Sequence, residues 1–214
     1  MPATAPRIAV VDYGAGNLKS VAKALARSGL EPCVTSEAAT VRGADGVVLP
    51  GVGAFADAAS RLRERGLDDA VKEALLAGRP YLGLCLGLQV LFDESDEHGV
   101  TAGLGVIHGR VERFPDRDEA GAQLRVPHIG WNTVVYDGLH PMLERLPKED
   151  CYYFVHSYRA VATRPGDAIG VADYGGDFAA AVATDGLFAV QFHPEKSQRA
   201  GRTLLDAYAA WVRS

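Results

Sequence analysis

A cysteine flanked by glycines stands near the middle of the chain. Residues 83–87 read Gly-Leu-Cys-Leu-Gly, the pattern glycine-x-nucleophile-x-glycine, with an apolar run before it and a run of helical periodicity after it. In a turn from strand to helix, larger side chains at the two glycine positions would collide with neighbouring backbone. The N-terminus of the helix would favour a thiolate at Cys85 over a thiol. The segment therefore fits a cysteine nucleophile, and the alternative is a small buried apolar residue.

An imidazole and a carboxylate lie two residues apart near the C-terminus. His193-Pro194-Glu195 follows an apolar run, and in extended backbone residues i and i+2 share a face. A carboxylate beside an imidazole fixes its tautomer, so that the imidazole can take a proton from a thiol and give it to a leaving amine. We therefore expect Cys85, His193 and Glu195 to act together. A zinc deaminase also carries His-x-Glu, but no Pro-Cys-x-x-Cys follows it here.

Two backbone segments could stabilise the oxyanion that forms when a thiolate attacks a carbonyl group. Each N–H donor at such a site is commonly worth about 3 kcal/mol. The N–H of Leu86, directly after the nucleophile, is one candidate. The loop Gly51-Val52-Gly53, at the carboxyl end of another expected strand, is the other. An ordinary turn from strand to helix would also explain these glycines.

The elements that must position these residues alternate between strand and helix in the first half of the chain. Apolar runs predict strands at 8–11, 32–35, 46–49 and 81–84, and helical periodicity predicts helices from Leu18, through Leu62 to Leu75, and from Leu86 to Phe92. Continuous apolar strands separated by helices indicate a parallel sheet covered on both faces.

The second half contains short segments separated by glycine, proline and acidic turns. They predict strands in mixed or antiparallel pairing at 106–114, 130–136, 152–156, 168–172, 179–183 and 187–191. A helical stripe from Ser197 to Val212, with Ser197 as its N-cap, closes the fold. We expect one α/β domain over residues 1–214: a mixed, mainly parallel sheet flanked by helices, with extra antiparallel strands in the C-terminal half.

Composition and charge argue against nucleic acid and membranes as binding partners. The chain has 214 residues and a net charge of −5, without the basic excess of a nucleic-acid-binding surface. Its longest apolar stretch, 81–92, is shorter than the roughly 20 residues that a membrane-spanning helix needs. The first residues lack the apolar segment of a secretory signal, so we expect a cytoplasmic protein that binds neither nucleic acid nor membrane.

The remaining cysteines and histidines show no metal or disulfide pattern. Cys33, Cys85 and Cys151 are odd in number and far apart, which fits neither a disulfide framework nor a zinc site. We expect Cys33 and Cys151 to be buried bystanders and no metal to be bound. Structural roles are expected for the other histidines: His98, His108, His128, His140 and His156.

Three motifs together resemble one known family, the class I, or triad, glutamine amidotransferases. The motifs P-G-x-G, G-x-C-x-G-x-Q and H-P-E occur in this order at 50–53, 83–89 and 193–195. The resemblance implies a flavodoxin-like fold, glutamine as substrate and no cofactor. It also implies a γ-glutamyl thioester on Cys85 that water hydrolyses to glutamate, with His193 shuttling protons and Glu195 orienting His193.

The resemblance further assigns residues that hold the substrate. Gln89, one helical turn beyond the nucleophile, contacts the amino-acid end of glutamine, and Glu97 pairs with its ammonium group. The backbone of Ser157-Tyr158 contacts its carboxylate. Without the resemblance, Gln89 reads as a polar residue on a helix face and Glu97 as a solvated charge.

Further segments resemble the glutaminases of the histidine pathway. They are 12–17, 50–55, 127–132, 152–158 and 193–197. The resemblance implies that ammonia passes to a separate (β/α)8-barrel cyclase, docked at a face that includes Asn17, Trp131, Tyr153 and Lys196. By type alone, the two aromatic residues would be core and the lysine a solvated charge.

Two other functions remain open at this point. One is a triad glutaminase that serves a different synthase. The other, from a different class, is a non-catalytic, doubly wound binding module that keeps the fold without the reaction.

Overall fold

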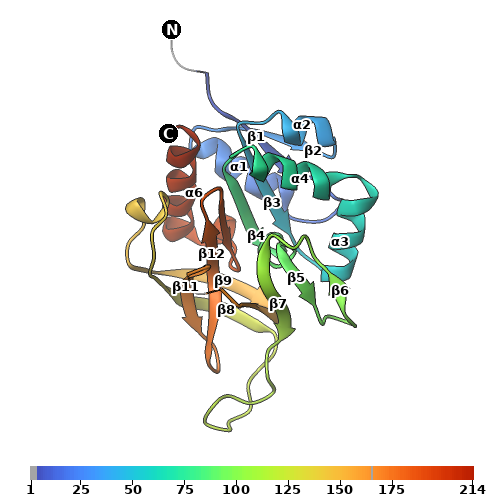
Figure 1. Ribbon diagram of the computed structural model, residues 1–214. Coiled ribbons are helices and arrows are strands. Elements are labelled where there is room, and N and C mark those ends of the chain that lie inside the picture. Colours follow the sequence, from blue (N-terminus) through green and yellow to red (C-terminus); the bar gives the residue numbers. More distant parts are fainter. Residues whose placement is uncertain (1–3, 165) are drawn as a thin grey trace.

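A mixed sheet of 13 strands runs through the computed structural model, which describes residues 4–164 and 166–214 (Figure 1). The strand order is β2-β1-β3-β4-β13-β12-β10-β7-β5-β6, and β11, β8 and β9 continue from β12. The strands are β1 (Arg7–Val11), β2 (Glu31–Thr35), β3 (Gly46–Gly51), β4 (Tyr81–Cys85), β5 (Phe92–Ser95), β6 (Thr101–Ala102), β7 (Ile107–Arg113), β8 (His128–Tyr136), β9 (Glu149–His156), β10 (Tyr158–Ala162), β11 (Ala168–Asp173), β12 (Asp177–Thr184) and β13 (Leu187–Val190). The helices are α1 (Leu18–Arg27), α2 (Ala38–Arg42), α3 (Phe55–Glu64), α4 (Leu67–Leu76), α5 (Leu86–Gln89) and α6 (Gln198–Val212), with short 3₁₀ turns η1 (Leu143–Arg145) and η2 (Pro194–Lys196).

Strand direction divides the sheet into two regions. In the parallel region, β2, β1, β3, β4 and β13 all run the same way, and Gly51 of β3 stands opposite Cys85 of β4. In the antiparallel region, β12 pairs with β13, β10 and β11, and β8 joins β11 to β9. The expected α/β fold, with a parallel core and antiparallel strands in the C-terminal half, is confirmed.

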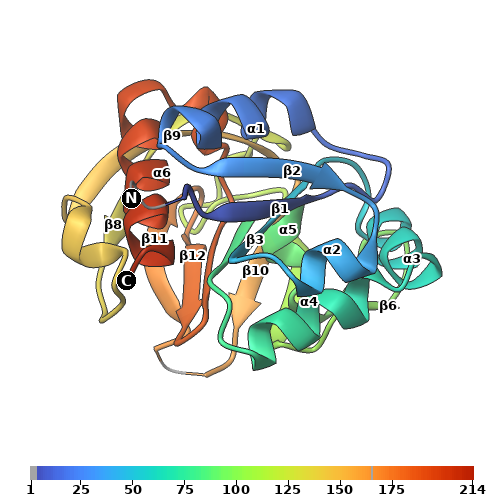
Figure 2. The ribbon, with the colours of Figure 1, turned by 90° about the horizontal axis from the view of Figure 1, so that it is seen from above.

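Helices cover both faces of the parallel region. Figure 2 shows α1 on one side of β1 and β2, and α2, α3 and α4 on the other, while α6 packs in the same core cluster as α1. Along β1, Ile8 and Val10 pack with α1 and α6, whereas Ala9 and Val11 pack with α2 to α4. Because successive side chains of a strand point to opposite faces, a strand buried on both sides reads as a continuous apolar run.

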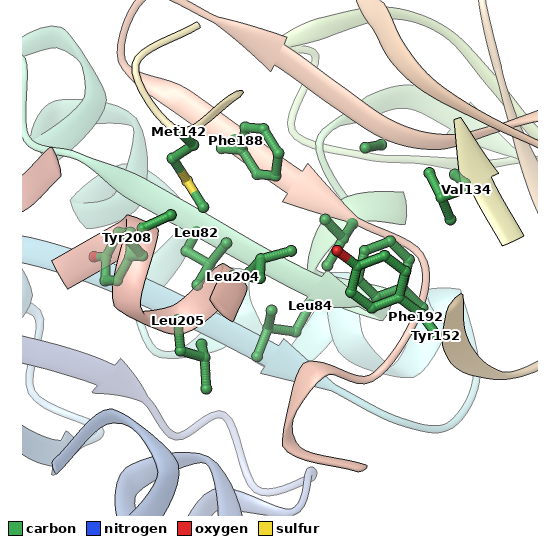
Figure 3. Close-up of a cluster of buried hydrophobic side chains, with 14 of the residues drawn as sticks. Leu82, Leu84, Val134, Met142, Tyr152, Phe188, Phe192, Leu204, Leu205 and Tyr208 are labelled. Atoms are coloured by element: carbon green, nitrogen blue, oxygen red, sulfur yellow. The ribbon is translucent and has the colours of Figure 1, made fainter. Parts of the chain in front are cut away.

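The core under α6 joins the two regions. Leu204 and Leu205 of α6 pack on Leu82 and Leu84 of β4, and the same cluster reaches Tyr152 of β9 (Figure 3). The aromatic ring of Tyr152 stacks on Phe192, with 3.9 Å between the ring centroids. The helix that closes the chain therefore also holds β9 against the strand that bears the nucleophile.

Two predicted helices differ from the structure. The stretch through Leu62 to Leu75 is broken into α3 and α4 at Gly66, which has a φ of 63° that glycine adopts without strain. The helix expected to reach Phe92 ends at Gln89, and Phe92 enters β5, where it pairs with Ile107 of β7. The prediction was wrong there because uniform burial removes the periodicity that separates helix from strand.

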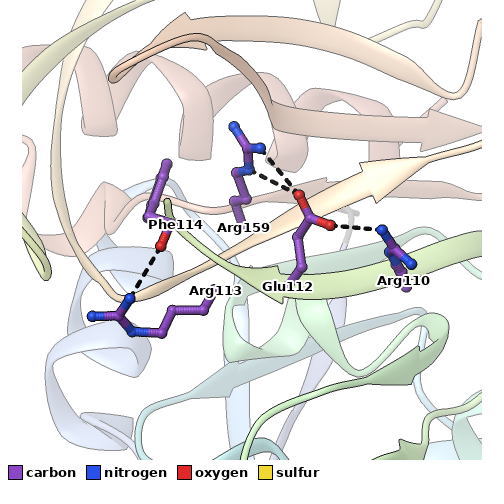
Figure 4. A network of polar contacts seen from close by, with 5 residues as sticks. All are labelled: Arg110, Glu112, Arg113, Phe114 and Arg159. Carbon is purple, nitrogen blue, oxygen red and sulfur yellow. Dashed lines mark hydrogen bonds and ion pairs between the residues drawn. The ribbon is translucent and has the colours of Figure 1, made fainter. Parts of the chain in front are cut away.

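Besides β5, the short elements α2, β6 and β10 were not expected from the sequence. An ion-pair network holds β10 in register with β7 (Figure 4). Arg159 of β10 donates to Glu112 of β7 at 3.0 Å, and Arg110 donates to the second carboxylate oxygen of Glu112 at 3.0 Å. The strand β10 begins at Tyr158, so this pairing fixes one wall of the site described below.

The two cysteines expected to be buried are not. Cys33 is partly exposed on the edge strand β2, and Cys151 is exposed on β9. Alternation along β9 explains the second error, because Tyr152 takes the buried side and its neighbour must face outward. In the described part of the chain, no helix has the length and apolar character to span a membrane.

Candidate active site

Cys85 occupies a strained turn between β4 and α5. Its φ is 54° and its ψ is −107°, and its side chain is 7% exposed. A β-carbon on Gly83 would lie 2.6 Å from the carbonyl oxygen of Gly87, and one on Gly87 would lie 1.8 Å from the carbonyl oxygen of Leu49. Both glycines are therefore required by close packing of backbone, as the sequence pattern predicts. A non-glycine residue at such a φ is a common feature of functional sites.

His193 and Glu195 form a buried pair just after β13. The Nδ1–H of His193 donates to Oε1 of Glu195 at 3.0 Å, and the two side chains are 4% and 3% exposed. Glu195 lies in the 3₁₀ turn η2, so the expected extended geometry is wrong although the expected contact forms. A tight turn folds the carboxylate back toward the ring.

The charge state of His193 depends on its two neighbours. Burial alone lowers its pKa, but interactions with the neighbouring Cys85 and Glu195 outweigh burial and raise the pKa to about 10. Nε2 of His193 has no hydrogen-bond partner among the described residues. The ring is thus held as an imidazolium at neutral pH, with one N–H free to face a reacting group.

A pocket of about 380 Å³ opens at the carboxyl ends of β3 and β4. It is lined by Val52, Gly53, Cys85, Leu86, Gln89, Glu97, Pro127, Val155, His156, Ser157, Tyr158 and His193. The structure thus brings together most of the catalytic, oxyanion and substrate residues expected from the sequence or its resemblance. The exceptions are Gly51 and Glu195, which are not part of this lining. Such crevices at the carboxyl ends of parallel strands are the usual ligand sites of α/β folds.

The backbone donors expected for an oxyanion lie on two sides of Cys85. Leu86 is the first residue of α5, so its N–H has no partner within the helix. A β-carbon on Gly51 would lie 2.5 Å from the hydroxyl oxygen of Tyr13, so only glycine fits there. Burial raises the pKa of Tyr13, while the N–H of Val52 lowers it in part. The hydroxyl of Tyr13 is buried and has no hydrogen-bond partner among the described residues.

Gln89 and Glu97 present free acceptor atoms to the pocket. Nε2 of Gln89 donates to the carbonyl oxygen of Tyr158 and to Oε1 of Gln191, both at 3.0 Å, which leaves its own Oε1 available. One carboxylate oxygen of Glu97 accepts the N–H of Phe55 at 2.6 Å. The two acceptors suit an ammonium group, which carries only donors.

Three of the four residues expected at a partner interface lie together. Trp131 of β8 and Tyr153 of β9 stand opposite each other, with ring centroids 6.1 Å apart, and Nζ of Lys196 lies 5.8 Å from the Tyr153 ring. Trp131 is 49% exposed, so it is not a core residue. Asn17 is exposed at the N-cap of α1, and no side-chain hydrogen bond joins it to the other three among the described residues.

Ser197 links this surface to the catalytic turn. It stands at the N-cap position of α6, but its hydroxyl does not cap the helix. Instead it donates to the carbonyl oxygen of His193 at 2.7 Å and accepts the N–H of Tyr153 at 3.0 Å. The N–H of His193 also donates to the carbonyl oxygen of Tyr153 at 3.0 Å.

Three polar residues of the site region were missed from the sequence, besides the apolar Pro127 and Val155 of the pocket lining. Tyr13 lies under Gly51, Gln191 touches Cys85, and His156 lines the pocket. The position of the first two at the ends of β1 and β13 was the available signal, because polar residues at the carboxyl ends of parallel strands gather at one edge. His156 sits at the end of an antiparallel strand, where no such rule applies.

Comparison with known proteins defines the class. Residues 9–207 match the family described as glutamine amidotransferase class-I, so the chain belongs to that family. Similarity is high to imidazole glycerol phosphate synthase subunit HisH of Methylococcus capsulatus, at 49% identity over 95% of this chain and 96% of that protein. HisH of Symbiobacterium thermophilum is 47% identical over 96% of this chain and 94% of that protein. Within the class, the chain belongs with the HisH subunits, the glutaminase subunits of imidazole glycerol phosphate synthase in histidine biosynthesis.

Solved structures show the same fold at low identity. PurLQS from Thermotoga maritima has a TM-score of 0.74 at 19% identity, covering 97% of this chain and 99% of that one. The glutaminase domain of CTPS from Trypanosoma brucei has a TM-score of 0.66 at 21% identity, covering 96% of this chain and 94% of that one. At these identities the likeness extends to the fold and carries no information about the reaction.

Proposed function

We propose that this chain hydrolyses glutamine at Cys85 and delivers the ammonia to a (β/α)8-barrel cyclase, its partner in imidazole glycerol phosphate synthase. The observation that carries the proposal is one pocket in which Cys85, the imidazole of His193 and the free acceptors of Gln89 and Glu97 meet. The cytoplasmic location and the single domain over residues 1–214 belong to the same proposal.

Substrate binding uses the polar groups at the far end of the pocket. Oε1 of Gln89 and the carboxylate of Glu97 receive the α-ammonium group of glutamine, and the backbone of Ser157 and Tyr158 receives its carboxylate. The side chain of glutamine then extends toward Cys85. A carboxylate paired with the ammonium across a half-buried pocket contributes a charge-assisted hydrogen bond, about twice as strong as a neutral one.

The first chemical step makes a thioester. The Cys85 sulfur, whose proton His193 has taken, attacks the amide carbon of glutamine as a thiolate, and the carbonyl electrons move onto oxygen, where Leu86 N–H stabilises them. Collapse of this intermediate breaks the C–N bond, and Nε2–H of His193 protonates the departing nitrogen, which leaves as ammonia. Because its pKa is raised, His193 holds this proton at neutral pH.

The second step hydrolyses the thioester and regenerates the free enzyme. His193, now neutral, removes a proton from a water molecule, whose oxygen attacks the thioester carbon. Glutamate forms when the C–S bond breaks and its electron pair returns to sulfur. Glu195 keeps the ring aligned through both steps, because its hydrogen bond holds the proton on Nδ1 and leaves Nε2 to do the transfers.

The loop Gly51-Val52-Gly53 offers a way for the partner to control glutaminase activity. Val52 lines the pocket next to the nucleophile, and it is 43% exposed. Turning this peptide toward the pocket would add a second donor beside Leu86. We infer that the docked cyclase, with its nucleotide bound, favours the turned peptide and so raises glutaminase activity.

Ammonia must reach the cyclase unprotonated. In bulk water at neutral pH it would largely become ammonium and lose its nucleophilic lone pair. The surface of Trp131, Tyr153 and Lys196 is connected to the catalytic turn through Ser197, which suits a docking face over one end of the barrel. Asn17 is assigned to the same face as part of the proposal.

Glutamate release by the purified chain tests the function. It is measured alone, with the cyclase, and with the cyclase and its nucleotide ligand. A large increase in the ternary mixture, lost in Cys85→Ala and kept in the exposed-cysteine control Cys151→Ala, is the expected result. Activity that ignores the cyclase would assign the glutaminase to another synthase, and release that persists in Cys85→Ala would overturn the proposal.

A further inference from the structure

Gln191 is a buried polar side chain that the mechanism above does not use. It directly follows β13 and is 0% exposed, two residues before His193. Its backbone N–H donates to the carbonyl oxygen of Ala180 at 2.9 Å. Its carboxamide bridges two residues of the active site, because Oε1 accepts from Nε2 of Gln89 at 3.0 Å and Nε2 donates to Sγ of Cys85 at 3.6 Å.

The surrounding hydrogen bonds determine which end of this amide faces the sulfur. The carbonyl oxygen of Tyr158 can only accept, so the amino group of Gln89 must point toward it. The second N–H of that amino group then donates to an oxygen of Gln191. The amino group of Gln191 is thereby left facing Cys85, where it can only donate.

The carbonyl group of Tyr158, which accepts the hydrogen bond from Gln89, is held in place by a second hydrogen bond from His156. Nδ1 of His156 lies 2.8 Å from it, and Nε2 of His156 lies 3.0 Å from Nδ1 of His128. Burial lowers the pKa of His156 to about 3 and that of His128 to about 4, so both rings are neutral near pH 7. His156 therefore donates from Nδ1 to Tyr158 and accepts at Nε2 from His128.

We propose that Gln191 is a catalytic residue whose side-chain N–H stabilises the Cys85 thiolate, both before attack and when the thioester breaks. The proposal rests on the role of Cys85 in the proposed function. A thiolate on a side chain that is 7% exposed has little access to water, so its charge needs a donor from the protein. A hydrogen bond to an ionised acceptor is roughly twice as strong as one between neutral groups.

The contribution differs between the states of the reaction. When Cys85 gives up its proton, Gln191 N–H binds the negatively charged sulfur. When sulfur donates its electron pair to the amide carbon, that charge moves to the oxyanion and the N–H···S bond weakens. When the thioester C–S bond breaks, the pair returns to sulfur and the bond to Gln191 strengthens again. Gln191 therefore assists thiolate formation and thiolate departure, and it transfers no proton itself.

Other titratable groups also act on the Cys85 thiol and must be kept constant in a test. His193, after β13, carries the opposing positive charge, and Tyr13, after β1, interacts with the thiol through its buried phenol. Glu97, from the segment after β5, and Tyr158 of β10 share the pocket. A change confined to Gln191 leaves all four in place.

The substitution Gln191→Glu isolates the donor. One carboxylate oxygen can still accept from Gln89, while the other replaces the N–H that faces sulfur. Gln191→Met removes the donor without adding charge, at similar side-chain length. Gln123→Met makes the same chemical change on an exposed loop residue and serves as the matched control.

The measurement is the rate of Cys85 alkylation by iodoacetamide across pH, with thiolate absorbance near 240 nm as a second readout. We expect the midpoint of the alkylation profile to rise by about one pH unit in both variants, which is a roughly tenfold smaller thiolate fraction at neutral pH. In the complex with the cyclase, kcat for glutamate release should fall roughly tenfold with KM changed less than about threefold. Thermal unfolding shows that each variant is folded.

Two outcomes would overturn the inference. An unchanged alkylation profile in a folded Gln191→Met variant would leave Gln191 a packing residue, whatever happens to kcat. A shift in Gln191→Glu without one in Gln191→Met would assign the effect to charge repulsion. Because alkylation needs no glutamine turnover, either result leaves the proposed function standing, whereas failure of the proposed function would appear as glutamate release in Cys85→Ala.

Discussion

The parallel and antiparallel regions of the sheet serve the site in different ways. The parallel region supplies the nucleophile from a turn where backbone atoms approach so closely that only glycine fits at Gly83 and Gly87. The antiparallel region supplies the consecutive residues Val155 to Tyr158 to the pocket, where β9 ends and β10 begins, and along β8 and β9 more buried residues alternate with more exposed ones. In the parallel region, close backbone contacts fix the position of the nucleophile. In the antiparallel region, the alternation of side chains along a strand lets the same strand contribute to the core and to the surface.

The difference extends to charge. The catalytic histidine, next to the parallel strand β13, has a pKa raised by its partners, whereas the buried histidines of the antiparallel region have pKa values lowered by burial. A raised pKa keeps a proton ready for a leaving group. A lowered pKa keeps His128 and His156 neutral, so that they can form a fixed hydrogen-bond chain.

The largest effect should come from Glu195→Gln. The carboxylate fixes the His193 tautomer, and a carboxamide can donate to Nδ1 and so turn the proton to the wrong nitrogen. We expect kcat for glutamate release to fall by about 10³-fold or more, by analogy with other catalytic triads. The variant Glu94→Gln on the exposed side of β5 should keep its activity. A loss of less than about tenfold would show that the tautomer is fixed by something else.

Stability should respond most to the parallel turn. In Gly87→Ala, the new β-carbon would lie 1.8 Å from the carbonyl oxygen of Leu49, and neither atom can move away unless the backbone moves with it. We expect the free energy of unfolding to fall by more than about 3 kcal/mol, in the range seen for severe core substitutions.

The matched change Gly121→Ala tests the contrast. No atom lies within 4 Å of a β-carbon there, although the φ of 83° is strained for alanine. We expect a loss of about 1 kcal/mol. Equal losses at the two positions, measured by urea unfolding, would show that backbone strain rather than contact decides the cost.

Sequence alone predicted the parallel region well and the antiparallel region partly. Strands buried on both faces give unbroken apolar runs, so β1, β3 and β4 were found within one or two residues. The glycine pattern around Cys85 followed from local sterics, which need no knowledge of distant contacts. By contrast, β10 and β5 could not be predicted, because their pairing with β7 depends on partners far away in sequence.

The site shows the same division. The triad and the substrate residues were anticipated from motifs and resemblance, and the structure gathers them in one place. The amide of Gln191 was missed, since its role depends on a contact between residues 106 positions apart. The failed N-cap at Ser197 has a similar cause, because Tyr153 competes for the hydroxyl.

Acid should unfold the protein through its buried histidines. The pKa values of His128, His140 and His156 fall to about 4, 4 and 3 on burial, so the unfolded chain binds protons more readily below its own pKa of about 6.5. Their stabilising effect is complete above pH 6.5 and lost as the pH falls toward 4. Each histidine should add a slope of about 1.4 kcal/mol per pH unit in that window.

The catalytic histidine should show the opposite sign. The pKa of His193 is raised to about 10, so its contribution is complete below pH 6.5 and is lost as the pH rises through 10. Removing the thiol in Cys85→Ala takes away part of what raises this pKa, so the alkaline loss of stability should be complete at a lower pH than in the unmodified protein. NMR titration of the imidazole nitrogens measures both groups, and equal directions for His156 and His193 would contradict the contrast between the regions.

The smallest effect should appear at the antiparallel surface. Trp131 is 49% exposed and packs on Tyr153, so truncation removes little core. We expect Trp131→Ala to weaken binding of the barrel cyclase by about 10-fold or more, as for a central interface aromatic, with a change in unfolding free energy below about 1 kcal/mol. Isothermal titration calorimetry measures cyclase binding by this variant and by the control Leu139→Ala. Leu139 is fully exposed (101%) and follows β8 in the antiparallel region. If both variants bound the cyclase alike, the docking face would have to lie away from β8, and the connection through Ser197 to the catalytic turn would lose its purpose.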